Sequence, residues 1–167
     1  MTGSTVPYRF AYMKTGKVPG TIADLDSRVA SLDFAMIQNK IVAEGEVKWT
    51  QNQRNLAERE YRRFLTLIAR YPNQDVVPNR VMDTFWHYHI LDTQKYEKDT
   101  KLVFGSFLHH FPYFGLRGKD DRKALHRAFK KTKELYRNTF GTPMRSPIGK
   151  YGNAGSSCSR ACVSACK

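Results

Sequence analysis

The sequence predicts an all-α fold, a single-domain helical bundle built around one central helix. Apolar residues recur at spacings of three and four along several long stretches, as they do on the buried face of a helix. No Asn-Gly or Asp-Gly turn joins two alternating apolar runs, so the usual β-hairpin signal is missing. With 167 residues the chain is long enough to bury one core. We therefore expect one helical domain over residues 21–140.

The first helical region is predicted over residues 21–44. Apolar residues recur at helical spacing in its first half and again in its second half, with a break between them near Ser31. Gly45 follows the last apolar residue of the series and is expected to end the region, because glycine readily adopts the left-handed conformation that stops a helix.

A capping box is predicted to open the next helix. Thr50 is followed three residues later by Gln53, so each side chain can bond to the backbone N–H of the other. The apolar series that follows continues to about Tyr71, and Pro72-Asn73 is a strong signal for a turn. The helix is therefore expected to end before Pro72.

The central helix is predicted to run without interruption over residues 79–103. Asn79 is a good N-cap and Gly105 is a stop signal. Apolar residues occupy nearly every side of its first half, which is typical of a buried helix. A final helix is predicted to begin at Asp120 or Asp121 and to continue to Phe140.

The two ends of the chain have compositions that differ from the helical region. Residues 1–20 contain several proline and glycine residues and are expected to form an irregular N-terminal arm. Residues 141–157 are rich in glycine, proline and serine, as is typical of a linker. Residues 158–167 then form a tail that holds all three cysteines.

Histidines are concentrated in the central helix and in the turn that follows it, among many aromatic residues. Imidazoles close to a carboxylate are ligands for zinc, iron, nickel or copper, and three ligands with an open position suit catalysis. This pattern predicts a transition-metal site, with zinc, iron or copper as the expected cofactor. The candidate ligands are His87, His89, His109, His110 and Asp83.

The helical repeat indicates which of these ligands can meet. At about 100° per residue, His87 shares a face with Asp83, whereas His89 lies about 200° away from His87. The pair of Asp83 and His87 is therefore expected to be structural. The pair of His89 with His109 or His110 is expected to be functional. The alternative is that all these histidines are hydrogen-bonded residues of an aromatic core.

The cysteine tail is the second candidate for chemistry. Cys158, Cys162 and Cys166 lie four residues apart, and thiolates select copper(I) or zinc. The spacing lacks the C-x-x-C element of a zinc finger, and three is an odd number for internal disulfides. The tail could instead be the substrate of a partner enzyme that modifies its serines and cysteines, or an unreactive segment.

Basic residues form the third candidate. The chain has a formal net charge of +13, which predicts attraction to an anion, such as a nucleic acid, an anionic membrane surface or an acidic partner. No helix-turn-helix or zinc-finger motif accompanies the charge, and a basic series on a helix is more often a solvated face. The candidate anion-binding residues are Lys123, Arg127, Lys130 and Lys131.

Other classes lack their signatures. There is neither a G-x-S-x-G nucleophile motif nor a phosphate-binding loop of the G-x-x-x-x-G-K type. No apolar run approaches the roughly 18 residues of a membrane span, and the first residues do not have the pattern of a signal peptide. These observations predict a cytoplasmic protein with reduced thiols.

Three segments resemble one known family. The order LDFAMIQNK, VVPNRVMDTFWHYHILDTQKYEKD and FGSFLHHFPYFG is similar to the glycine-rich domain-containing proteins, whose shared region carries the pattern D-x-x-W-H-x-H-x-L. The resemblance extends over residues 30–118, and the short Gly/Ser/Cys end is similar to the tails of that family. It implies a domain identity rather than a reaction. The pattern falls on Asp83, Trp86, His87, His89 and Leu91.

Three functions follow from these patterns. The first is a metal-binding helical domain with a histidine-centred site, whose cysteine tail exchanges metal or is modified. The alternative is a carrier or precursor scaffold whose Ser/Cys-rich tail is modified by a partner enzyme. The third is a basic RNA-binding module.

Overall fold

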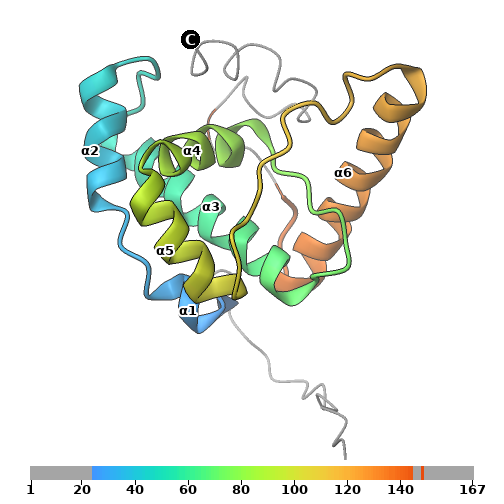
Figure 1. The fold of residues 1–167 in the computed structure, drawn as a ribbon, viewed down its shortest axis with the longest axis horizontal. Coiled ribbons are helices and arrows are strands. Elements are labelled where there is room, and N and C mark those ends of the chain that lie inside the picture. The colour runs from blue at the N-terminus through green and yellow to red at the C-terminus, as the bar shows by residue number, and fades with distance from the viewer. Residues whose placement is uncertain (1–23, 145–147, 149–167) are drawn as a thin grey trace, which may run out of the picture.

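The computed structural model describes residues 24–144 and residue 148, and over these residues the chain forms helices and no strands (Figure 1). The all-α prediction is confirmed. The expected arm at residues 1–20, most of the linker and the whole cysteine tail lie outside the described residues. The helices are α1 (Ser27–Ala30), α2 (Ala35–Glu44), α3 (Gln51–Arg70), α4 (Arg80–Leu91), α5 (Thr93–Phe104) and α6 (Lys119–Phe140).

Helix α3 occupies the middle of the fold. It packs against α1, α4 and α6, and its contact with α4 is the most extensive. In Figure 1, α6 lies at the right, and α1, α2 and α5 lie at the left. Phe34, Tyr61 and Phe85 are buried between the elements, with ring centroids 5.2–5.6 Å apart. This cluster of rings forms the centre of the main hydrophobic core.

The predicted capping box at the start of α3 is present. The Thr50 side chain accepts a hydrogen bond from the backbone N–H of Gln53 at 3.3 Å, and the Thr50 N–H donates to the Gln53 side chain at 2.8 Å. The helix ends at Arg70, two residues before Pro72. The sequence signals for both ends of α3 were therefore correct.

The prediction of one uninterrupted helix over residues 79–103 was wrong, because the chain breaks at Asp92. This residue has ψ 77°, outside the helical range, and its side chain accepts from the backbone N–H of Lys95 as the N-cap of α5. Asp92 therefore ends α4 and starts α5 in a new direction (Figure 1). An aspartate followed by threonine was the signal for this break, and the long apolar pattern obscured it.

The remaining boundaries differ from the predictions in detail. The break expected near Ser31 is present, since α1 ends at Ala30 and α2 begins at Ala35. Helix α6 begins at Lys119, before the two aspartates expected to open it. Asp121 caps a different segment: its Oδ2 accepts from the backbone N–H of Gly115 at 2.6 Å and of Arg117 at 3.1 Å.

Replacing Gly115 with alanine is expected to destabilise the protein more than the same change at Gly105. Both glycines have positive φ, 91° and 76°, so both changes carry the strain of a left-handed residue, about 1–2 kcal/mol. A Cβ on Gly115 would also lie 2.5 Å from Leu125 Cδ2, whereas Gly105 faces open space. Urea unfolding of the two variants measures the difference, and equal midpoints would contradict the close packing of residue 115 on α6.

Candidate metal centre

Three ligand side chains meet on one side of α4. Asp83 and His87 are one turn apart on this helix, and His110 comes from the segment that follows α5. All three side chains are 13–17% exposed, so the group lies near the surface and is partly accessible to solvent. Among the described residues, these three are the group of His, Cys, Asp and Glu side chains that can hold a metal ion.

The three ligand atoms surround one point. His110 Nε2 lies 3.2 Å from Asp83 Oδ1 and 3.2 Å from His87 Nε2, and His87 Nε2 lies 3.8 Å from Asp83 Oδ1. A point equidistant from three atoms with these separations lies about 2.0 Å from each, which is the length of a zinc–nitrogen or zinc–oxygen bond. The triangle of ligand atoms therefore has the size that one transition-metal ion requires.

Hydrogen bonding alone satisfies these contacts poorly. A ring nitrogen carries either one proton or one lone pair, and an ionised carboxylate only accepts. As a donor, His110 Nε2 divides its single proton between Asp83 and His87. If His110 Nε2 instead accepts a proton from His87, it has no proton to donate to Asp83, and two acceptor atoms then face each other. A cation takes one lone pair from each of the three atoms at the same time.

The protonation of His87 also suits a metal ligand. Burial lowers the pKa of His87, the negative charge of Asp83 opposes this effect, and His110 adds to it. The ring is therefore biased toward its neutral form, which is the form of imidazole that binds metals.

Trp86 helps to bring His110 to α4. The Trp86 indole N–H donates to the Tyr96 hydroxyl at 2.8 Å, and this hydroxyl donates to the backbone carbonyl of Leu108 at 2.5 Å. The Trp86 and His110 rings also pack at a steep angle, with centroids 4.5 Å apart and an interplanar angle of 70°. These contacts tie the segment after α5 to α4 two residues before His110. Sequence reasoning did not assign this role to Trp86.

His89 lies in a separate network inside the core. Its Nδ1 is 3.0 Å from the Tyr61 hydroxyl and its Nε2 is 3.1 Å from Asp99 Oδ2, which is also 2.8 Å from Lys95 Nζ. Because an ionised Asp99 can only accept, Nε2 carries the proton and Nδ1 accepts from Tyr61. Burial lowers the pKa of His89 to about 4 despite the opposing charge of Asp99, so the ring is neutral near pH 7. Both nitrogens are thus occupied by protein groups.

The structure separates the candidate ligands differently from the sequence interpretation. The pair assigned a structural role, Asp83 and His87, belongs to the group that can hold a metal ion, and His110 meets this pair rather than His89. His89 points away because it is two residues from His87 on one helix, and the turn at Asp92 places Asp99 beside it. His109 is exposed and packs on Phe107, with centroids 5.0 Å apart.

The other candidate residues are distributed as follows. Cys158, Cys162 and Cys166 lie outside the described residues. Lys123 is 3.2 Å from Asp120, and both side chains are exposed. Arg127 and Lys131 line a pocket between α6 and two loops, whereas Lys130 does not.

Among the described residues, no helix combines the length and the apolar character needed to cross a lipid bilayer.

These features define an all-α protein with a two-histidine, one-aspartate group that can hold a metal ion. The chain belongs to the UCP032817-like family, whose model matches residues 26–141 and so extends over the whole helical region. No curated protein and no solved structure matches the chain. The family description carries no reaction and no ligand.

The resemblance to the glycine-rich domain-containing proteins was wrong, since the matching family is a different one. That resemblance depended on the D-x-x-W-H-x-H-x-L pattern, whose residues here contact α3, α5 and the segment that follows α5. Trp86 and His89 complete buried hydrogen bonds, and His87 faces Asp83 one turn away. The nine-residue pattern does not by itself identify a family.

Proposed function

We propose that the protein binds one divalent transition-metal ion through Asp83, His87 and His110. The convergence of the three ligand atoms carries the proposal, because a point about 2.0 Å from each of them lies between all three. The three residues come from two segments joined through Trp86 and Tyr96. The site is therefore held by the fold and does not depend on the side chains of one helix alone.

Zinc fits this group better than iron, nickel or copper in an octahedral site. Ligand atoms in a tetrahedral zinc site with bonds of 2.0–2.1 Å are about 3.3 Å apart. At the same bond length, neighbouring ligands of an octahedral ion are only about 2.9 Å apart. The observed separations of 3.2, 3.2 and 3.8 Å are closer to the tetrahedral value. Iron(II) remains the runner-up, because two histidines and one carboxylate are its usual ligands in oxygenases.

Three protein ligands leave a fourth zinc position open. This is the arrangement of catalytic zinc sites, in which bound zinc supplies Lewis-acid chemistry to a water molecule or a substrate. All three side chains are 13–17% exposed, which supports a fourth position that solvent can reach. We therefore propose a site that exchanges ligands with solution rather than a closed structural site.

Replacing His110 with alanine is expected to abolish stoichiometric zinc binding, whereas His109→Ala should retain it. The two residues are adjacent in one segment, but only His110 contributes a ring nitrogen to the group. Loss of one of three ligands should raise the Kd for zinc roughly 100-fold or more. The measurement is native mass spectrometry of each variant loaded with zinc, compared with its denatured mass, and a competition titration with a chromophoric chelator.

His87→Ala provides a second test and is expected to behave as His110→Ala does. Circular dichroism would confirm that each variant keeps its helices. Zinc retained by both variants at the wild-type Kd would reject the site. Replacing zinc with iron(II) in the same titration distinguishes the two metals, since the preferred ion gives the lower Kd after correction for its general affinity order.

A further inference from the structure

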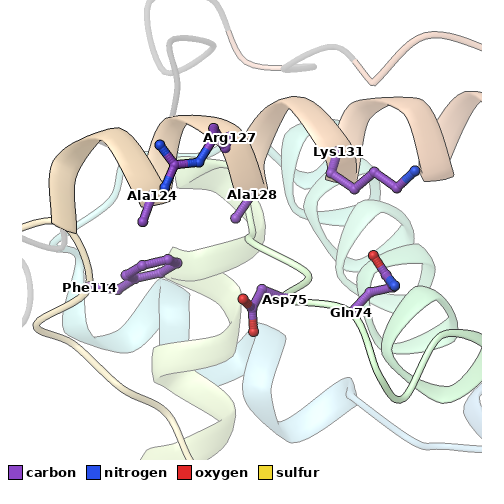
Figure 2. A pocket seen from close by; sticks show the side chains of 7 residues that line it. All are labelled: Gln74, Asp75, Phe114, Ala124, Arg127, Ala128 and Lys131. Atoms are coloured by element: carbon purple, nitrogen blue, oxygen red, sulfur yellow. The ribbon is translucent and has the colours of Figure 1, made fainter. Parts of the chain in front are cut away.

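A pocket of about 300 Å³ lies between α6 and two loops, at a place separate from the metal-binding group (Figure 2). One loop connects α3 to α4 and supplies Gln74 and Asp75, and the other precedes α6 and supplies Phe114. The volume is at the lower end of the range for small-molecule sites. Its lining residues are Gln74, Asp75, Phe114, Ala124, Arg127, Ala128 and Lys131.

The walls of this pocket are held in place. Phe114 packs on a second hydrophobic cluster formed by Val77, Leu125 and Phe129, which is separate from the main core. The next residue, Gly115, is bound through its N–H to Asp121. On the other side, the backbone N–H of Val77 donates to Thr132 Oγ1 of α6 at 2.9 Å. Both loops are therefore fixed to α6, so ordering them on binding costs little entropy.

The chemistry of the lining is specific. Figure 2 shows the Phe114 ring facing α6 below Ala124 and Ala128, with the Asp75 carboxylate beside it. Arg127 and Lys131 are one helical turn apart, so both belong to the same face of α6. A ligand here would meet two cations, one aromatic face and one carboxylate.

Each of these features excludes some ligands. A simple inorganic anion would gain from the two cations but would make no use of the ring and would be repelled by Asp75. An apolar molecule would leave both cations unused. A nucleoside phosphate satisfies all of them, because it combines an anionic phosphate, a planar base and hydroxyl or amino donors.

We propose that this pocket binds a nucleoside phosphate, with its phosphate on Arg127 and Lys131, its base on the face of Phe114, and a donor of the sugar or base on Asp75. The nucleotide is either a free mononucleotide or one unit of a single-stranded RNA, since both present the same groups. The site is independent of the proposed metal site, because the two share no residue.

The test uses the full chain, treated with a chelator so that metal binding does not contribute. Adenosine monophosphate is titrated by calorimetry, and a fluorescent oligoadenylate RNA is titrated by anisotropy at several salt concentrations. Phe114→Leu keeps an apolar residue on the second cluster but removes the ring, and should weaken binding about fivefold or more. Phe111→Leu is its control, because Phe111 is exposed in the same segment and does not line the pocket.

Lys131→Ala and Lys130→Ala form the second matched pair. Both remove one positive charge from an exposed position of α6, but only Lys131 lines the pocket. Lys131→Ala should weaken binding several-fold. For RNA it should also reduce the slope of log affinity against log salt concentration by about the amount that one phosphate contact contributes. Lys130→Ala should change either value much less.

Binding of the mononucleotide, weakened by Phe114→Leu and Lys131→Ala, supports the proposal with a free nucleotide as ligand. Binding of the RNA alone, weakened by the same two variants, supports it with an RNA strand as ligand. Equal effects of Lys130→Ala and Lys131→Ala would show that attraction is spread along α6, and would overturn the proposal. No binding of either probe would also overturn it, and both lysine variants keep this test valid if Phe114→Leu loses its fold.

Discussion

Glu60→Ala is expected to lower the free energy of unfolding by about 3–5 kcal/mol, because it leaves a buried cation without its partner. Glu60 and Arg63 on α3 are only 3% and 7% exposed. Arg63 donates to Glu60 at 3.3 Å, and Tyr136 of α6 donates to Glu60 at 2.6 Å. Arg63 also donates to the Tyr136 hydroxyl at 2.5 Å. Removal of the carboxylate therefore takes one hydrogen-bond partner from both Arg63 and Tyr136.

This network is a major polar link between α3 and α6. Burial, and then the charge of Glu60, raise the pKa of Tyr136 well above its usual range, so its hydroxyl remains a donor. The Arg63 guanidinium also lies 5.1 Å from the centroid of the Phe140 ring near the end of α6. Loss of Glu60 should therefore loosen the packing of α6 as well as lower the stability.

Urea unfolding followed by circular dichroism measures the effect. Glu134→Ala is the control, because Glu134 is an exposed carboxylate of α6 that lies 3.8 Å from Lys131. Exposed ion pairs contribute little, so this variant should unfold near the wild-type midpoint. A Glu60→Ala protein as stable as Glu134→Ala would show that the buried network does not stabilise the contact of α3 with α6.

Asp99→Ala is expected to lower the free energy of unfolding by about 2–4 kcal/mol, because it leaves the buried N–H of His89 without an acceptor. His89 is 1% exposed and Asp99 is 6% exposed, so water cannot readily replace the lost carboxylate. Lys95 loses its ion pair with Asp99 in the same variant. The effect should be seen in the midpoint of thermal or urea unfolding.

Asp99→Asn separates the two contributions. The asparagine side-chain oxygen can still accept a hydrogen bond from His89. The side chain is neutral, however, so it forms no ion pair with Lys95. The free energy of unfolding is expected to fall by about 1–2 kcal/mol, which is less than in Asp99→Ala. The proposed zinc binding should persist in Asp99→Asn, because Asp99 does not belong to the group of Asp83, His87 and His110. Equal losses for the two variants would mean that the hydrogen bond to His89 contributes little.

The two histidines of the W-H-x-H segment lie in different surroundings, although they are only two residues apart. A helix turns about 200° over two residues, so their side chains leave α4 in nearly opposite directions. His87 joins Asp83 and His110 near the surface, and His89 enters the core toward α3 and α5. The aromatic surroundings of the segment come mainly from the core on the side of His89.

The helices themselves were largely predictable, because their signals are local. Thr50 and Gln53 form the capping box that their spacing predicts, and Gly45, Gly105 and Gly141 end three helices in the left-handed conformation. The apolar residues that predict the buried face of α3 are spaced three or four positions apart, which is about one turn of a helix. Such features depend on residues within about four positions of one another, and so they can be recognised along the chain.

The angle between α4 and α5 was harder to predict from the sequence. One aspartate, Asp92, divides the predicted central helix, and the apolar pattern that continues through this position favours the opposite outcome. The cap alone does not predict where α5 points after the break. That direction depends on the packing of α5 against α4 and α1, which involves residues far apart in the sequence.

By itself the sequence determined the all-α class, the ends of most helices and the residue types that can bind a metal. Only the tertiary structure decided which of those residues meet. Asp83 and His87 share a helical face by local geometry, but His110 reaches them through the turn at Asp92 and the bonds from Trp86 to Tyr96 and Leu108. The same is true of the pocket on α6, whose walls come from three separate segments. Spacing along a helix determines direction, whereas proximity between segments depends on how the whole chain packs.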